Sequence, residues 1–494
     1  MERSLVRRTR HRFSPDPRRV ITKPFHPGED TWEGNSRVKM ILMRILKIPE
    51  AQVSSMLTDI MARFSFRHDG FEQTLLQSSQ HVWHHIDDGI EVSHDRRLLI
   101  GAYFVHEYSI ESASLCNPSI VAAPDQSGVE EGSLRVVMSL RAVGEGHISS
   151  IEFRTGIIGP DASVSFDPPG PFVDIGRRTP NAAYDKPLFN QKLAELGADN
   201  TIASFVLKHL PSPFTFEQLE NAITLVEEEA ISPAMKYETI KIMHWLASSN
   251  YTLDFPPTTS LSERVIFPAG PAESHGMEDA RFVRFVDDDG SITYYATYTA
   301  FDGYQILPQL IMTDEFVTFQ VRTLNGAEAQ NKGLALFPRR IRGKYAMLSR
   351  QDAENLYYMT SDNIRFWNKA ELLAMPSRPW QLIQIGNCGS PIETEAGWLV
   401  LTHGVGPMRQ YAIGAMLLDL DNPHRLIARL PEPLLVSEED DRDGYVPNVV
   451  YTCGGLIHRD HLIIPYGVAD QTTVVATVAI GDLLDLLLEN RCAT

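Results

Sequence analysis

The sequence predicts a mainly β protein, a five-bladed β-propeller with an N-terminal helical module and a helical insertion. The first observation is a change of pattern, because helical spacing of apolar residues gives way near Asn117 to short β-rich runs bounded by turn residues. The second is that these runs repeat along the chain. The third is their spacing, since the later four copies lie about 55 to 60 residues apart, the length of one four-stranded antiparallel sheet with its turns.

Residues 1–110 are expected to form a basic arm followed by the helical module. Seven arginines among the first nineteen residues outnumber two acids, which is typical of a solvated arm that lies on an acidic body or on a neighbouring subunit. Apolar residues at three- and four-residue spacing then predict helices over 50–66, 71–87 and 95–109.

A histidine-rich segment inside this module, from His81 to Asp88, raises the question of a metal site. His81 and His85 would share one helix face, which is the geometry of helical zinc sites, but no glutamate stands between them in the metalloprotease position. The favoured interpretation is a helix face packed beside Trp83, and no metal is assigned.

Each repeat unit pairs an apolar strand with a second one that ends in a polar or basic residue. The five pairs are 117–121 with 136–141, 280–283 with 294–299, 337–338 with 345–350, 390–392 with 398–403, and 454–457 with 462–467. In a propeller, equivalent strand ends converge on a central funnel. The positions expected there are Arg141, Thr299, Arg350, His403 and Tyr466.

A helical insertion is expected within the repeat. Thr215 and Gln218 form a capping-box pattern, and Ser232-Pro233 is expected to open a further helix. The predicted organisation is therefore a propeller domain over 111–485, an insertion over 186–250, and a C-terminal tail over 486–494.

Composition narrows the class of protein. The chain has 494 residues, of which 43% are hydrophobic and 22% are charged, as in ordinary globular proteins. A net charge of -18 argues against general nucleic-acid binding. No apolar run approaches the ~20 residues of a membrane helix, so we expect a cytoplasmic protein that does not bind membranes. Four scattered cysteines predict neither a disulfide framework nor a zinc site, and no cofactor is expected.

The funnel residues point to a polar, oxygen-rich and partly anionic substrate. Carboxylates hydrogen-bond sugars, and the arginine fork matches phosphate. Inverting hydrolysis of a glycoside requires two carboxyl groups, an acid and a base. Attack by phosphate needs no base, so one acid and a set of cations suffice. The candidate cations are Arg141, Lys332, Arg350 and His403, and the candidate acids are Glu278, Asp279 and Asp470.

Several motifs follow one another through the predicted propeller. They are Gly276-Met277-Glu278-Asp279-Ala280-Arg281, Asn331-Lys332-Gly333 with Leu336-Phe337-Pro338, Ser349-Arg350, Gly397-Trp398-Leu399 with His403-Gly404-Val405, and Tyr466-Gly467-Val468-Ala469-Asp470. In their order and approximate spacing they resemble glycoside hydrolase family 130, a family of β-mannoside phosphorylases and some β-mannosidases. The match spans roughly residues 110–485.

The resemblance implies an inverting reaction at a β-mannosidic bond with inorganic phosphate, giving mannose 1-phosphate and a shortened acceptor sugar. Asp279 would be the general acid, its proton travelling through a sugar hydroxyl. The resemblance also implies binding roles for other residues. Asn117, Ser119, Arg141 and Asp470 would hold the mannosyl unit, Lys332 would stand where an arginine usually spans sugar and phosphate, and Arg350, His403 and Tyr411 would bind phosphate.

Two departures from the family pattern bear on the reaction. Ala280 replaces the usual proline beside the acid. Gln384 stands where the phosphorylases often carry a phosphate-binding lysine, and nearby Arg409 is a candidate replacement.

Several alternatives therefore stay open at this point. They are an inverting β-mannosidase on the same scaffold, a non-catalytic sugar-binding propeller, and mannosyl transfer from mannose 1-phosphate as the physiological direction. A structural alternative for Glu278 is that it only orients Arg281. A homo-oligomer is also left open.

Overall fold

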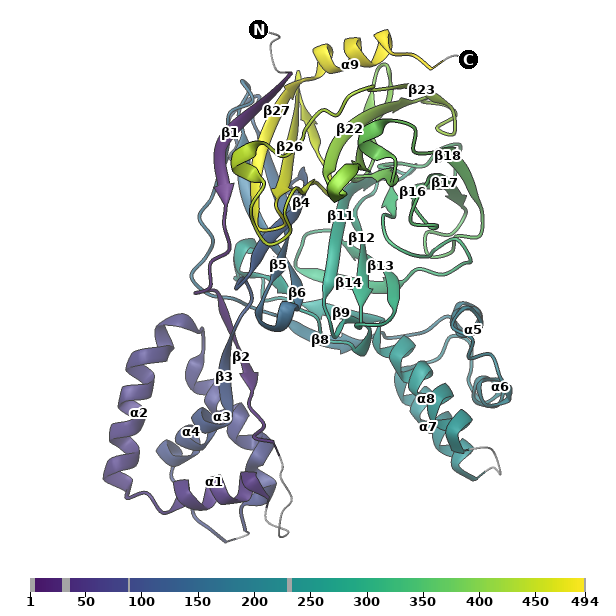
Figure 1. Ribbon diagram of the computed structural model, residues 1–494. Coiled ribbons are helices and arrows are strands. Elements are labelled where there is room, and N and C mark those ends of the chain that lie inside the picture. Colours follow the sequence, from purple (N-terminus) through teal and green to yellow (C-terminus); the bar gives the residue numbers. More distant parts are fainter. Residues whose placement is uncertain (1–4, 29–35, 88, 229–232, 493–494) are drawn as a thin grey trace. The chain divides into compact units, whose positions relative to one another are not determined.

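A computed structural model describes residues 5–28, 36–87, 89–228 and 233–492 (Figure 1). The chain divides into two compact units. The first comprises the N-terminal segment up to Pro15 together with Ala113–Pro169 and Gly176–Thr494, and the second comprises Asp16–Ser112 with Gly170–Ile175. No helix among the described residues is both long and apolar enough to cross a membrane.

The first unit is mainly β, and its described residues form five open antiparallel sheets, numbered I to V here in chain order. Most strands of each sheet are neighbours in the sequence, whereas sheets I, II and V also take strands from more distant segments. Sheet I contains β4 (Ser114–Ala122), β5 (Leu134–Val143), β6 (Ser149–Ile158), β7 (Val164–Phe166) and β10 (Val265–Ile266). Sheet II contains β11 (Met277–Val286), β12 (Ile292–Phe301), β13 (Ile306–Thr313), β14 (Thr318–Thr323), β9 (Tyr251–Asp254) and β8 (Arg177–Pro180).

The remaining three sheets follow the same antiparallel pattern. Sheet III contains β15 (Ala335–Leu336), β16 (Tyr345–Ser349), β17 (Leu356–Ser361) and β18 (Ala370–Ala374). Sheet IV contains β19 (Gln384–Asn387), β20 (Ile392–Thr394), β21 (Gly397–Val405), β22 (Tyr411–Leu418) and β23 (Leu426–Arg429). Sheet V contains β24 (Val450–Tyr451), β25 (Leu456–His458), β26 (His461–Val468), β27 (Thr472–Ala479) and β1 (Val6–Phe13).

All five strand pairs predicted from the repeat are confirmed. They are β4 with β5, β11 with β12, β15 with β16, β20 with β21, and β25 with β26. The prediction succeeded because each pair is local: two apolar strands that follow one another in the sequence pair across a single connection.

Buried apolar side chains fill the space between consecutive sheets, and also between sheet V and sheet I. Between sheets III and IV, for example, the buried rings of Phe337 and Trp398 meet edge to face with centroids 5.1 Å apart. Between sheets V and I, Ile463 and Val475 pack with Met138. The core of this unit is thus a series of inter-sheet layers.

The basic N-terminal segment is not the solvated arm that was expected. Val6–Phe13 forms β1, which pairs with β27 at the edge of sheet V. Arg8 and Arg12 both pair with Asp441, whose side chain is 3% exposed. The arginines therefore neutralise a buried carboxylate, a long-range contact that local sequence patterns cannot reveal.

The predicted insertion is helical and belongs to the first unit. Thr215 and Gln218 form the expected capping box at the start of one helix. A helix starts at Pro233 as predicted, whereas Ser232 lies outside the described residues. The helices are α5 (Lys186–Glu195), α6 (Thr201–Lys208), α7 (Phe216–Thr224) and α8 (Pro233–Ser248).

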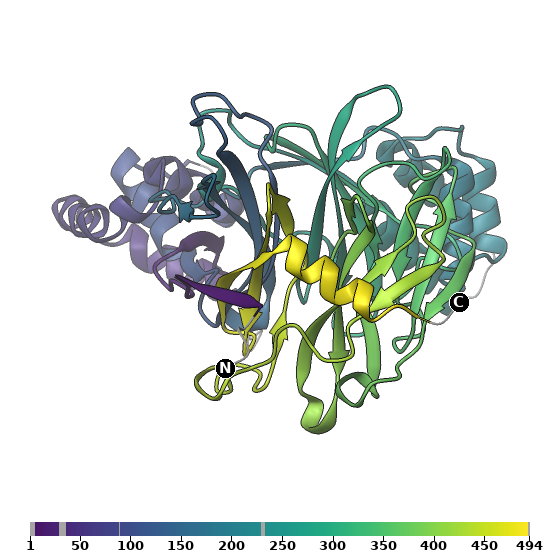
Figure 2. The same ribbon diagram turned by 90° about the horizontal axis from the view of Figure 1, so that it is seen from above.

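The end of the chain forms helix α9 (Ile480–Glu489), so the boundary predicted at residue 485 falls inside a helix. Leu483 and Leu487 are fully buried among side chains of sheets IV and V. Figure 2 shows α9 lying across the ends of these sheets. Its apolar stripe therefore closes one end of the core.

The second unit contains the predicted helices and a two-stranded sheet that was not predicted. The expected helix over 95–109 ends at Tyr103, because the following residues pair with an earlier strand. The elements are β2 (Val20–Pro24), α1 (Arg37–Leu46), α2 (Glu50–Phe64), α3 (Phe71–Val82), α4 (His94–Tyr103) and β3 (Val105–Ser109).

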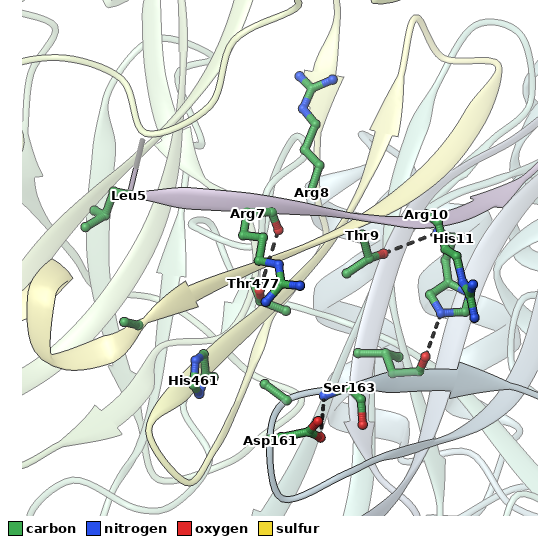
Figure 3. Close-up of a pocket in the computed structure, with 13 residues that line it drawn as sticks. Leu5, Arg7, Arg8, Thr9, Arg10, His11, Asp161, Ser163, His461 and Thr477 are labelled. Atoms are coloured by element: carbon green, nitrogen blue, oxygen red, sulfur yellow. Dashed lines mark hydrogen bonds between the residues drawn. The ribbon is translucent and has the colours of Figure 1, made fainter. Parts of the chain in front are cut away.

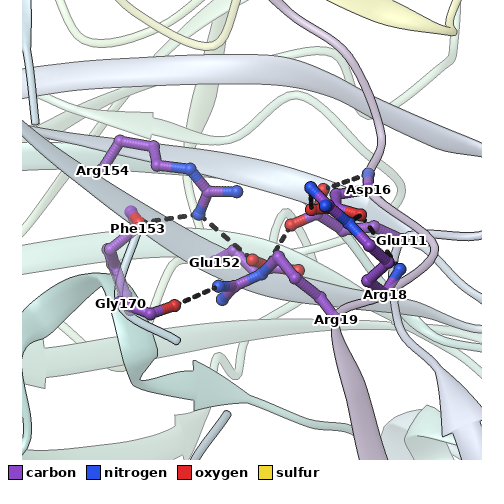
Figure 4. A network of polar contacts seen from close by, with 8 residues as sticks. All are labelled: Asp16, Arg18, Arg19, Glu111, Glu152, Phe153, Arg154 and Gly170. Carbon is purple, nitrogen blue, oxygen red and sulfur yellow. Dashed lines mark hydrogen bonds and ion pairs between the residues drawn. The ribbon is translucent and has the colours of Figure 1, made fainter. Parts of the chain in front are cut away.

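A buried ion pair supports the second unit beside this small sheet. Arg19 and Glu111 lie 2.8 Å apart and are 6% and 0% exposed (Figure 4). The Arg19 guanidinium also donates to the backbone carbonyl of Gly170 at 3.4 Å. Removing either charge would leave the other buried and unpaired, which commonly costs about 3–5 kcal/mol.

The histidine-rich segment does not assemble a metal site among the described residues. His84 and His85 lie in a 3-10 turn with tilted rings 4.0 Å apart, and Asp88 lies outside the described residues. No group of three or more potential ligands that could hold a metal ion is found anywhere in the described part of the chain.

Candidate active site

Two β-bulges bring an amide and a carboxylate together. The register shifts between Cys116 and Ser119 in β4, and between Glu278 and Arg281 in β11. Within these bulges Asn117 has φ 48° and Asp279 has φ 56°, in the left-handed region that few residues other than glycine adopt.

The two bulged side chains contact each other directly. Asn117 Nδ2 donates to Asp279 Oδ1 at 2.6 Å. Paired backbone strain of this kind is typical of functional sites, where the surrounding fold holds a side chain in a strained position.

A network of charges surrounds these bulges. Glu278 accepts hydrogen bonds from Arg141 at 2.8 Å and from Lys332. Arg141 Nη1 also lies 3.8 Å from Asp279 Oδ1. Glu278 thus pairs with Arg141 of sheet I and with Lys332 of the loop before β15, and among the described residues no hydrogen bond or ion pair joins it to Arg281, the residue it was suggested to orient.

Arg281 instead supports the backbone of the bulge. Its side chain is buried, donates to the Asp279 carbonyl at 3.4 Å, and donates to the Tyr451 hydroxyl at 2.7 Å. Tyr451 belongs to β24, so this contact links sheet II to sheet V.

The charge state of Asp279 follows from these neighbours. Burial raises the pKa of its carboxyl group, but the charges of Arg141, Arg281 and Lys332 and the Asn117 hydrogen bond lower it further than burial raises it. The net pKa lies below the ordinary value, so the carboxyl group is ionised at neutral pH in the free protein.

Asp470 is the second carboxyl group near this network. It occupies the turn after β26 with φ 47°. Burial raises its pKa to about 6, the charge of Asp279 adds to that effect, and Arg141 and Arg409 oppose it. Two carboxyl groups in one site thus have pKa values pushed in opposite directions, a frequent feature of catalytic centres.

Asp470 carries a pH-dependent stability cost that Asp470→Asn should remove. Its pKa is raised from 3.8 to about 6, so the folded protein binds more protons than the unfolded chain between these values, and stability falls as pH rises through that window. We expect Asp470→Asn to raise the free energy of unfolding by about 1–2 kcal/mol at pH 8 and by little at pH 4, allowing for partial screening by water. Urea unfolding at both pH values measures this difference.

The control for that substitution is Asp460→Asn, which changes an exposed acid in the β25–β26 turn and should have no pH-dependent effect. An Asp470→Asn protein less stable than the wild type at pH 8 would refute the predicted cost. Asparagine tolerates the left-handed backbone, so strain is not expected to mask the result.

A second cluster gathers Arg350, His403 and Tyr411 around Gly386. A side chain at Gly386 would come within 2.5 Å of the His403 ring and 3.1 Å of Arg350 Cδ, so only glycine lets β19 approach both. The rings of His403 and Tyr411 are nearly parallel with centroids 6.1 Å apart. Gln384 Nε2 lies 3.3 Å from His403 Nε2.

The fixed charge of this cluster comes from Arg350. Burial lowers the pKa of His403 well below its ordinary value, and the charges of Arg350 and Arg281 lower it further, so the imidazole is neutral. Arg350 Nε is buried and has no hydrogen-bond partner among the described residues, which leaves a donor available to a ligand.

Comparisons with known proteins show the family of this chain. The family model for glycoside hydrolase family 130, described as beta-1,4-mannooligosaccharide phosphorylase, matches residues 256–489. A 1,2-beta-oligomannan phosphorylase of Thermoanaerobacter sp. is 34% identical over 219 residues, covering 43% of this chain and 71% of that protein. The chain belongs to glycoside hydrolase family 130.

Other members of family 130 are more distant. A beta-1,2-mannobiose phosphorylase of Listeria innocua is 28% identical over 308 residues, covering 61% of this chain and 81% of that protein. The solved structure of beta-1,2-mannobiose phosphorylase from Listeria innocua, in complex with beta-1,2-mannobiose, aligns with a TM-score of 0.45 and 21% identity, covering 77% of this chain and 93% of that one.

Two residues expected near the centre, Ser119 from the family resemblance and Tyr466 from the strand repeat, have buried side chains with structural contacts. Ser119 is fully buried, and its hydroxyl accepts from the Phe282 amide at 3.1 Å, which joins β4 to β11. Tyr466 is also buried, and its ring lies 5.9 Å from the guanidinium carbon of Arg8. Strand ends predict which residues are close to a centre, but not which way each side chain points.

A cavity of about 550 Å³ lies beside β1, where none of the predicted site residues lines it (Figure 3). Arg7, Arg10 and His461 are among its lining residues, and His11 Nε2 contacts the Val164 carbonyl at 2.6 Å. Cavity size alone therefore does not locate the chemistry in this protein, since the converging charges lie around Asp279.

The contacts of Arg281 and Gly386 were missed by sequence reasoning. Tyr451 lies 170 residues beyond Arg281, and no local pattern reports their hydrogen bond. A glycine inside a strand, here Gly386 between Ile385 and Asn387, is a sequence signal for such a close approach.

Proposed function

We propose that this member of family 130 is a β-mannoside phosphorylase built on a five-bladed β-propeller. The propeller is supported by the five antiparallel sheets and by the apolar layers between consecutive sheets and between the last and the first. Such packing fits blades arranged around a common axis. The reaction is supported by the mannoside phosphorylases among its relatives and by the charge distribution around Asp279.

The observation that carries the proposal is the combination of an ionised Asp279 with a separate Arg350 and His403 cluster. The Asp279 carboxylate, held by the charges of Arg141, Arg281 and Lys332, suits proton relay beside a sugar. A cluster with Arg350 and a neutral imidazole suits an anionic nucleophile. In this proposal Asn117, Arg141, Lys332 and Asp470 hold the mannosyl unit, while Arg350, His403 and Tyr411 hold phosphate. Ser119 holds β4 to β11 and contributes to sugar binding only through Asn117.

The reaction balances if phosphate supplies the proton. Dihydrogen phosphate gives a proton to Asp279. A phosphate oxygen then attacks the anomeric carbon from the face opposite the acceptor. The bond from the anomeric carbon to the acceptor oxygen breaks, and that oxygen takes the proton from Asp279 through a sugar hydroxyl. The products are mannose 1-phosphate and the free acceptor, and Asp279 returns to its ionised form.

Product analysis tests this proposal. Incubation with a β-mannobiose is expected to give mannose 1-phosphate in proportion to the phosphate added, and less than about 1% of that rate of free mannose without phosphate, because water lacks the charge that the cluster binds. Chromatography with separate quantification of both products measures this ratio. Equal mannose release with and without phosphate would overturn the proposal.

An inverting β-mannosidase is the second candidate, favoured by one observation. Asp470 has a raised pKa of about 6 beside Asp279, and inverting hydrolysis uses two carboxyl groups of unequal pKa. Phosphate-independent mannose release that disappears in Asp470→Asn would select this candidate.

A further inference from the structure

A strained turn at the edge of the Arg350 and His403 cluster carries an arginine that the proposed reaction leaves unassigned. Pro407–Arg409 forms a 3-10 turn between β21 and β22, and Met408 and Arg409 both have φ 56°. Two successive left-handed residues without glycine are costly. The turn closes with a hydrogen bond from the Gly406 amide to the Gln410 carbonyl at 2.9 Å.

The turn is positioned by the same strand that carries Tyr411. The Tyr411 amide donates to the Asn448 carbonyl at 3.0 Å, which ties the start of β22 to the loop before β24. The guanidinium carbon of Arg409 lies 6.0 Å from the centroid of the Tyr411 ring, and that ring is nearly parallel to His403. Arg409 therefore lies beside Tyr411, the aromatic residue of the proposed phosphate cluster.

The other cations of the site already have partners. Arg141 and Lys332 pair with Glu278, and Arg281 bonds the Asp279 carbonyl and the Tyr451 hydroxyl. Arg409 is exposed, and the structure gives it no ion pair among the described residues. Its charge acts on the Asp470 carboxyl group, but no ion pair with a carboxylate of the described residues holds it in place.

The cluster itself has a deficit of positive charge for a phosphate ion. His403 is neutral, Gln384 is uncharged, and Arg350 is the cation that lies against Gly386. Arg281, whose charge also acts on His403, is held by the Asp279 carbonyl and the Tyr451 hydroxyl. A phosphate near neutral pH carries between one and two negative charges, and its oxygens match the two-pronged guanidinium group. One further arginine within side-chain reach would balance that charge.

We propose that Arg409 is the second phosphate-binding cation of this enzyme, recruited from the turn over Tyr411 when phosphate enters beside Arg350 and His403. This inference rests on the proposed phosphorylase function and deepens it by naming a specificity-determining residue. The left-handed turn presents the guanidinium at the mouth of the cluster, and its exposure in the free protein leaves it able to move.

Kinetics of Arg409→Ala test the assignment. Loss of one charge-assisted contact is expected to raise KM for phosphate about 10- to 100-fold, while KM for the mannoside changes less than about twofold. Arg409→Lys should lie between, since lysine keeps the charge and loses the fork. Gln384→Lys added to Arg409→Ala should recover much of the loss, because it places a cation beside His403 from β19.

The matched control is Arg342→Ala, because Arg342 is also an exposed arginine at a left-handed turn position, with φ 51°. It should leave both KM values unchanged. An Arg409→Ala enzyme with the wild-type KM for phosphate would overturn the inference.

Calorimetric titration with inorganic phosphate separates this inference from the proposed function. The expected result is a dissociation constant raised about 10- to 100-fold in Arg409→Ala and unchanged in Arg342→Ala. Equal phosphate affinities of Arg409→Ala and wild type overturn the role of Arg409 whatever the reaction proves to be. Phosphate-independent mannose release by the wild type overturns the phosphorylase function, while the binding isotherms still decide the role of Arg409.

Discussion

Asp279→Asn is expected to lower the rate of phosphorolysis by about 1,000-fold, the contribution of a positioned proton donor. Asparagine keeps the shape of the side chain and tolerates the left-handed backbone of the bulge, so the substitution removes proton transfer and little else. The measurement is kcat with mannobiose and phosphate, together with binding of mannobiose by calorimetry, which should persist.

The control for this substitution is Asp289→Asn, which changes an exposed acid in the β11–β12 turn and should retain full activity. The free energy of unfolding of Asp279→Asn should also be compared with that of the wild type. The pKa of Asp279 is lowered in the fold, so its carboxylate stabilises the protein above the ordinary pKa and that contribution is lost as pH falls through the depressed value. Asp279→Asn with near-wild-type turnover would end the assignment of this residue as the acid.

Arg281→Met is expected to destabilise the protein by about 3 kcal/mol, the largest stability effect we predict for a single side chain of the site. The substitution fills a similar volume but leaves the Tyr451 hydroxyl and the Asp279 carbonyl without their guanidinium partner in a buried setting. Urea unfolding of Arg281→Met measures this loss. Urea unfolding of Tyr451→Phe, for which a destabilisation of about 1 kcal/mol is expected, tests the other partner of the hydrogen bond.

Arg284→Met supplies the comparison on the same strand. Arg284 lies on β11 three residues beyond Arg281 but is only partly buried, so its loss should cost less than about 1 kcal/mol. If Arg281→Met proved as stable as Arg284→Met, the hydrogen bonds of Arg281 would not support the bulge as described.

The fold was predictable where contacts are local. Each of the five predicted pairs joins two strands that are neighbours in the sequence, so a repeated local pattern of apolar strand, turn and apolar strand was enough to find them. The capping box at Thr215 likewise depends on residues three apart. The pairing of β1 with β27 joins residues more than 450 positions apart, and no neighbouring residue reports it.

The candidate site also has features that were predictable from local sequence and features that were not. The family resemblance predicted Asp279 as the acid and Arg350 and His403 as phosphate ligands; these roles stay predictions, and the structure shows only that Arg350 and His403 both lie against Gly386. Glu278 was suggested as a support for Arg281, whereas it pairs with Arg141 of sheet I and with Lys332 of the loop before β15. Residue types and their order indicate the chemistry, but the partner of each charge depends on which strands become neighbours.

Sequence alone thus predicts the β-rich repeat, the helical insertion and a set of candidate acids and cations, because each depends on local spacing or on residue type. Tertiary structure decides the ionisation of Asp279, the neutral state of His403 and the position of Arg409 beside Tyr411. These properties depend on burial and on distances between charges from different sheets, and such distances exist only after the chain has folded.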